Sequence, residues 1–190
     1  MVQFKLAKEV AKLKDDALLI GFFKNKLGLE GDIKRLDENY NKAISSYISN
    51  KFFEGEKGEL RILYTGKEIK NIALIGLGEE EKFSMDVLLN CIADCLKKLR
   101  DSGIKSISMF QDSFKNKKFE DSEVVEILVL GSITGLYKFT EFKTKDESQN
   151  KSVNQINLIV NSSKSFGKEL EYATAVGEAV IKTRNLVNTP

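Results

Sequence analysis

Histidine and tryptophan are both absent from this chain of 190 residues. Without histidine the chain lacks the commonest general base and the commonest metal ligand, so triads and zinc sites that need an imidazole are excluded. Hydrolysis catalysed by carboxylates and lysine is not excluded. The most recognisable kinds of catalytic site are therefore missing.

Cysteine and long apolar segments are also scarce. The chain has two cysteines and no Cys-rich pattern, which is typical of a protein from a reducing compartment. The longest apolar run, Ala17 to Phe23, is far shorter than the ~20 residues that cross a bilayer. The start of the chain carries no charged segment followed by a long apolar one, so we expect no secretion signal and a cytoplasmic, soluble protein with no membrane partner.

Neither sign of charge dominates the composition. The 30 basic and 28 acidic residues leave a formal charge of +2, which argues against nucleic acid or an anionic membrane as the main partner. Hydrophobic residues make up 42% of the chain and charged residues 31%, as in an ordinary globular protein. This length suits one α/β domain, or one domain plus a connecting element.

Strand and helix patterns alternate along the chain. Short apolar runs predict strands over residues 2–6, 16–23, 60–64, 72–77, 104–110 and 154–160. Helical spacing predicts helices over about 33–47, from a Ser84 cap to Arg100, from Ser122 to Phe139, and from Ser163 or Ser165 to Pro190. We therefore expect an α/β fold, in which a mixed, largely parallel sheet is flanked by helices.

Three further features bear on organisation. The segment from Thr140 to Ser152 is polar and charged, which predicts a surface loop. Residues 1–162 are expected to form the α/β domain, and residues 163–190 a long C-terminal connecting helix. Gly131 and Gly135, four apart on a predicted helix, predict the close approach of another element.

Cys91 and Cys95 share one face of a predicted helix and could be interpreted as a metal or redox pair. Leu88, Ile92 and Leu99 occupy the same stripe, and no second pair of ligands exists to complete a tetrahedral site. Buried thiols pack as small hydrophobic groups. Core packing is the better interpretation.

Gly76-Leu77-Gly78 follows a predicted strand, as a phosphate-binding loop does. The third glycine of the dinucleotide fingerprint is missing, and Glu79, Glu80 and Glu81 follow where they would repel a phosphate. A tight turn between strand and helix is therefore favoured over a nucleotide cradle.

Two other motifs give no site. Gly131-Ser132-Ile133-Thr134-Gly135 lacks the nucleophile-elbow order and has no histidine as base. Lys115, Lys117 and Lys118 form a basic turn beside Phe114 and Phe119, for which a solvated loop is favoured over nucleic-acid contact. We assign no catalytic, cofactor-binding or metal-binding residue to this chain.

Several segments, in order, resemble the amino-terminal region of the leucyl aminopeptidase family, the M17 metallopeptidases. The most specific is Ala179 to Pro190, which is similar to the family's Ala-x-x-x-x-x-Arg-Asp-Leu-Val-Asn-x-Pro segment, with Asn185 in place of the usual Asp. The other similar segments are Leu36-Asp37, Phe53-x-Gly55 with Gly58-Glu59, Ile72 to Gly78, and Gly135-Leu136-Tyr137-Lys138-Phe139.

The resemblance implies an amino-terminal α/β domain similar to the macro-domain fold, followed by a larger catalytic domain. That domain would bind two divalent metals, zinc or manganese, through Lys, Asp and Glu residues downstream of the Asn-x-Pro segment. The implied enzyme removes amino-terminal residues from peptides, leucine among the favoured ones, and assembles as a hexamer. Since the chain stops at Pro190, it is expected to be an inactive fragment whose partner is its own catalytic domain.

Two alternatives stay open beside this interpretation. A free-standing macro-like module would bind ligands of the ADP-ribose type, against which the Glu79 to Glu81 run argues. A DNA-binding module would follow the habit of some bacterial relatives, with little support from the near-neutral charge.

Overall fold

The sheet is mixed and largely parallel, as expected. The computed structural model describes residues 2–8, 14–139, 151–160 and 165–189. Its strands are β1 (Gln3–Ala7), β2 (Ala17–Phe23), β3 (Leu60–Tyr64), β4 (Asn71–Gly78), β5 (Ser106–Phe110) and β6 (Gln155–Ile159). They lie in the order β1-β6-β5-β2-β4-β3, and every neighbouring pair is parallel except the β3–β4 hairpin.

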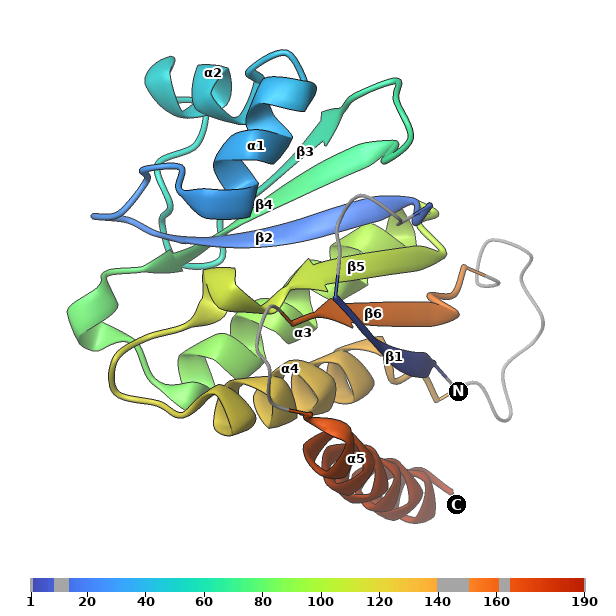
Figure 1. Cartoon of the computed structure of the whole chain (residues 1–190). Coiled ribbons are helices and arrows are strands. Elements are labelled where there is room, and N and C mark those ends of the chain that lie inside the picture. The colour runs from blue at the N-terminus through green and yellow to red at the C-terminus, as the bar shows by residue number, and fades with distance from the viewer. Residues whose placement is uncertain (1, 9–13, 140–150, 161–164, 190) are drawn as a thin grey trace.

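Helices cover both faces of this sheet (Figure 1). One face carries α1 (Gly31–Asn39) and α2 (Ala43–Ser49). The other carries α3 (Met85–Asp101) and α4 (Asp121–Leu136), with α5 (Gly167–Asn188) packed outside α4. Short 3-10 turns, η2 (Glu80–Lys82) and η3 (Gln111–Phe114), follow β4 and β5. None of the helices in the described ranges has the length and apolar character needed to cross a membrane.

The central strand β2 is buried along its whole length. Ala17 and Leu19 belong to the core beneath α3 and α4, while Leu18 and Ile20 belong to the core beneath α1 and α2. Successive side chains of a strand point to opposite faces, so an unbroken apolar run suits a strand covered on both sides. The predicted strand over 16–23 is confirmed.

The single helix predicted over 33–47 is wrong, because two helices occupy this stretch. Asn41 and Lys42 have φ angles of +59° and +56°, which break the helix between α1 and α2. The Asp37 carboxylate accepts hydrogen bonds from the amides of Ile44 (2.7 Å) and Ser45 (3.3 Å), and so caps the start of α2. The apolar spacing continues across the break, which is why periodicity does not reveal it.

Helix ends were predicted with mixed success. Ser84 caps α3 through the Val87 amide, as expected. At α4, however, the cap is Glu120 in a reciprocal capping box with Glu123, instead of Ser122, and the helix ends at Leu136 before reaching Phe139. At α5 the capping residue is Phe166 and no side chain caps the helix, so Ser165 does not fill the predicted role. Ser163 and residues 140–150 lie outside the described ranges.

The close approach predicted at Gly131 and Gly135 is confirmed. A Cβ added at Gly135 would lie 2.5 Å from the Cα and carbonyl oxygen of Ala93, and one added at Gly131 would lie 3.0 Å from the Leu89 carbonyl oxygen. Helix α5 packs equally closely on α4, since a Cβ on Gly177 would lie 2.4 Å from Ile133. Glycine thus allows α3, α4 and α5 to stack in close contact.

Asp16 ties together the amino ends of three strands. Its carboxylate accepts hydrogen bonds from the amides of Lys105 (3.1 Å) and Ser106 (3.2 Å) before β5, and pairs with Lys70 (3.0 Å) before β4. Burial alone would raise the pKa of Asp16, but the Lys70 ammonium and the two amides outweigh it and hold the pKa below its ordinary value.

Substituting Gly135→Ala is expected to lower the free energy of unfolding by about 1–3 kcal/mol, because the new methyl group meets backbone atoms of α3 that cannot move aside. This loss exceeds the gain of about 1 kcal/mol that alanine brings to a helix. Urea denaturation measures the change. Gly167→Ala is the matched control, since its Cβ meets no atom closer than 3.7 Å; equal stability of the two variants would contradict the packing argument.

Substituting Asp16→Asn is expected to cost about 1–3 kcal/mol at pH 7, because the charged acceptor is lost. A carboxyl whose folded pKa is depressed stabilises the fold above its unfolded pKa, so the difference from wild type should shrink as the pH falls below about 4. Urea titrations across this range test it. Asp94→Asn, at an exposed pair with Lys97, should change stability by less than about 0.5 kcal/mol. A loss that stays constant with pH would refute the role of charge.

Candidate functional site

The Gly76-Leu77-Gly78 segment ends β4 and lies directly against a second glycine-containing loop. A Cβ on Gly76 would lie 2.0 Å from the carbonyl oxygen of Glu56, so no side chain fits there. Three backbone hydrogen bonds join the two segments, from Gly76 N to Glu59 O (2.8 Å), Gly58 N to Gly76 O (2.9 Å) and Gly78 N to Gly55 O (3.0 Å). A fourth runs from Lys24 N, just after β2, to Gly78 O (2.9 Å). The glycines therefore allow the two backbone segments to cross in close contact.

The three glutamates that follow are tied to lysines. Glu79 pairs with Lys82 at 2.7 Å and Glu80 with Lys26 at 2.5 Å. The Glu81 carbonyl oxygen accepts a hydrogen bond from the Lys118 ammonium at 2.8 Å. The Glu79–Lys82 pair closes the turn after β4 on itself, while Lys26 and Lys118 join it to the segments after β2 and β5.

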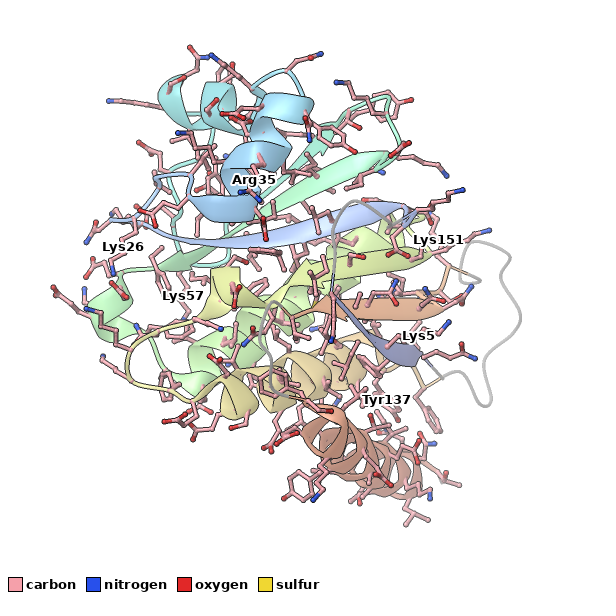
Figure 2. All side chains as sticks on the ribbon, in the orientation of Figure 1. Lys5, Lys26, Arg35, Lys57, Tyr137 and Lys151 are labelled. Carbon is pink, nitrogen blue, oxygen red and sulfur yellow. The ribbon has the colours of Figure 1, made fainter. Side chains whose placement is uncertain are left out.

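A crevice of about 780 Å³ opens at the carboxyl ends of β2 and β5, beside the first turn of α1. In Figure 2 it lies around the labelled Lys26 and Arg35. The chain leaves β2 over one face of the sheet through α1 and α2, and leaves the neighbouring β5 over the other face through α4. Ligands of α/β proteins bind in crevices at such switch points. This crevice is the described position that best suits a small ligand.

The positive and negative charges that line the crevice nearly cancel one another. Its cations are Lys26, Arg35 and Lys115, and its carboxylates are Glu30, Asp32, Glu80 and Asp112, which leaves a formal charge of −1. Lys115 pairs with Asp112 (2.5 Å) and Asp121 (3.0 Å), Lys26 with Glu80, and Arg35 with Asp32 at 3.5 Å. A diphosphate would have to compete with these carboxylates for every cation.

The floor of the crevice is also filled. The Ser113 hydroxyl accepts a hydrogen bond from the Gly21 amide (2.9 Å) and donates one to the Phe110 carbonyl oxygen (2.6 Å). The Phe114 ring is fully buried against Gly21, where an added Cβ would lie 2.8 Å from it. The β2 backbone at this point therefore has no free amide to offer a ligand.

The other motifs take structural positions. Cys91 and Cys95 are both buried in the core beneath α3, and burial raises the pKa of both thiols, so they stay protonated. Ser132 is buried and donates to the Leu128 carbonyl oxygen within α4. Among the residues that the structure describes, no three His, Cys, Asp or Glu side chains gather to hold a metal ion.

The basic turn is only partly the solvated loop that was predicted. Lys117 and Lys118 are exposed, whereas Lys115 is half-buried between its two aspartates. Phe114 is in the core, and the Phe119 ring packs edge-on against Phe83 with centroids 6.0 Å apart. Neither aromatic ring is placed to stack on a base.

A second surface lies at the end of α5. The Tyr137 hydroxyl, just after α4, donates to the Asn185 side-chain oxygen (2.8 Å) and accepts from the Asn188 amide group (3.2 Å). The Arg184 guanidinium lies 5.3 Å from the centre of the Tyr137 ring. Leu186 and Val187 beside this cluster are each 79% exposed. Both segments resemble family motifs, but no sequence pattern indicates the contact between them, 48 residues apart.

The chain is similar in sequence to proteins of a known family. A sequence model of the cytosol aminopeptidase family's N-terminal domain matches residues 19–146. A probable cytosol aminopeptidase from Sulfurihydrogenibium sp. is 30% identical over 187 residues, which cover 96% of this chain. The chain spans 36% of that relative's length.

Solved structures share the fold. A mutant of tomato leucine aminopeptidase superposes with a TM-score of 0.81 at 19% identity, over 100% of this chain and 39% of that one. A Trypanosoma brucei macrodomain in complex with ADP has a TM-score of 0.64 at 14% identity, over 90% of this chain and 67% of that one. The expected macro-like fold is confirmed.

Calorimetric titration with ADP-ribose is expected to give no saturable heat at ligand concentrations up to about 1 mM, a limit of about −4 kcal/mol in binding free energy. The reason is the pairing of all three crevice cations with carboxylates. A dissociation constant in the micromolar range would contradict this and favour a ligand-binding module.

Proposed function

Because the chain belongs to the cytosol aminopeptidase family, we propose that it is the amino-terminal, non-catalytic domain of a longer leucyl aminopeptidase. The match in sequence runs along nearly the whole chain, yet it covers little more than a third of each relative. The catalytic chemistry of the parent is assigned to the portion of the relatives that this chain does not span. The domain itself would support assembly or access to the active site.

The parent enzyme is proposed to remove amino-terminal residues, leucine among the favoured ones, from peptides. Two divalent metals, zinc or manganese, would supply a bound water as nucleophile and polarise the scissile carbonyl, chemistry that needs no histidine. The described residues of this chain do not fit such a site, because no three His, Cys, Asp or Glu side chains converge among them. We therefore place the metals outside this domain, as the family resemblance implies.

The outer side of α5 is proposed to dock on the catalytic domain. Val180, Leu186 and Val187 are exposed apolar side chains toward the end of this helix. Burying one such side chain contributes about 1.5–3 kcal/mol, so a covering domain would gain from all three. The division into a domain at 1–162 and a connecting helix at 163–190 belongs to this proposal, as do a hexameric parent and its place in the cytoplasm.

The single observation that carries the proposal is the family match. The exposed end of α5 adds a surface on which the next domain could pack. The alternative of a ligand-binding module is disfavoured by the ion pairs that occupy the crevice. A nucleic-acid module is disfavoured by the formal charge of +2 and by the packed aromatic rings beside Lys117 and Lys118.

The first test is the mass of the native protein in its source cell, measured by immunoblot with an antibody raised against this chain. A band well above 21.4 kDa is expected, and it should co-purify with hydrolysis of leucyl peptides. The activity should be lost with a chelator and restored by zinc or manganese, because the metals supply the nucleophile. Gel filtration of the same fraction tests for the hexamer.

The purified 190-residue chain is the matched control, and it should hydrolyse no leucyl peptide under the same conditions. A native band at 21.4 kDa without peptidase activity would overturn the proposal and leave a stand-alone domain.

A further inference from the structure

We propose that Tyr137 is a positioning residue that holds the last two turns of α5 against the end of α4. With Arg184, Asn185 and Asn188 it forms what we call the tyrosine clamp. The clamp would keep Leu186 and Val187 in one fixed orientation as a docking surface. The use of that surface rests on the proposed function, whereas the clamp itself does not.

The apolar contacts of α5 reach only part of its length. Leu170, Ala173 and Ile181 pack into the core shared with α4, and Gly177 lies against Ile133. These positions recur every three or four residues and form a stripe along one side of the helix. After Ile181, the side chains of residues 182–188 are exposed except for half-buried Asn185. The last two turns therefore gain little from the apolar core.

The tyrosine clamp supplies contacts of another kind to these turns. One hydroxyl group links both asparagines, because it donates to the Asn185 oxygen at 2.8 Å and accepts from the Asn188 nitrogen at 3.2 Å. Donors and acceptors in such a chain polarise one another. The Arg184 guanidinium over the Tyr137 ring adds a cation–π contact. Three residues of the last two turns thus meet one side chain of the neighbouring segment.

The position of Tyr137 suits this role. It directly follows Leu136 as the C-cap of α4, so its backbone is positioned by the helix that α5 packs against. Figure 2 shows the labelled Tyr137 directly beside α5. A crevice of about 490 Å³ lined by Tyr137, Thr183, Arg184, Val187 and Asn188 adjoins the clamp. Water can therefore solvate the asparagines when the hydroxyl is removed, and the fold need not be lost.

Without the clamp, the last two turns should fray. Short helical segments are marginally stable in water unless tertiary contacts hold them. The helix would still pack on α4 as far as Ile181, but Leu186 and Val187 would sample many orientations. A partner domain would then have to order the segment on binding, at an entropic cost.

Hydrogen exchange of the full 190-residue chain tests this. In Tyr137→Phe, amides of residues 185–189 are expected to exchange about three- to tenfold faster, as for the loss of one or two hydrogen bonds. Amides of α4 and β2 should keep their wild-type rates, which also reports that the variant folds. Tyr172→Phe is the matched control, since Tyr172 lies on the same helix and is 61% exposed. Unchanged exchange at residues 185–189 in Tyr137→Phe would overturn the proposal.

A second variant tests the hydrogen bond separately from packing, through the pH dependence of hydrogen exchange. In Asn185→Asp, the phenol would donate to a carboxylate, and such charge-assisted hydrogen bonds are about twice as strong as neutral ones. Protection factors of residues 185–189 should exceed wild type at neutral pH and fall as the pH drops below about 4, where the carboxylate is protonated. Protection that does not vary with pH would refute the hydroxyl contact. Neither measurement depends on peptidase activity, so failure of the proposed function would leave both readouts intact.

Discussion

Burial of β2 on both faces determines the layered arrangement of the domain. A strand with apolar side chains on both sides needs a layer of helices above and below the sheet. The chain therefore passes over one face through α1 and α2 and over the other through α3 and α4. The crevice at the carboxyl ends of β2 and β5 lies where the chain changes from one face to the other. Helix α5 packs outside α4 and therefore lies at the surface of the domain.

Glycine sets how closely these layers approach. Gly76 lets the loop around Gly55 and Glu56 cross the end of β4, while Gly135 and Gly177 let α3, α4 and α5 stack. Each of these positions would place a Cβ within 2.5 Å of a neighbouring atom. The end of α5 is therefore located by a series of close contacts that begins at the sheet and passes through α4 to Tyr137.

The fold alone does not assign a function, because macrodomains and the amino-terminal domains of aminopeptidases share it. The crevice and the α5 surface favour different functions. In the crevice, Lys26 and Lys115 already pair with carboxylates and Phe114 fills the floor. At the end of α5, Leu186 and Val187 face solvent with no apolar contact to cover them among the described residues. This contrast favours a domain that works by contact with another domain.

The sequence predicts those elements of the fold that depend on local patterns. The apolar runs of β2, β3 and β4 and the Ser84 cap could all be predicted, because neighbours along the chain specify them. It also determined the family, through motifs that keep their order. The break between α1 and α2 could not be predicted, because the Asp37 carboxylate overrides a continuous helical spacing. The strand order, the pairing of Lys26 with Glu80 and the contact of Tyr137 with Asn185 could not be predicted either, since they join residues far apart in the chain that only the packed fold brings together.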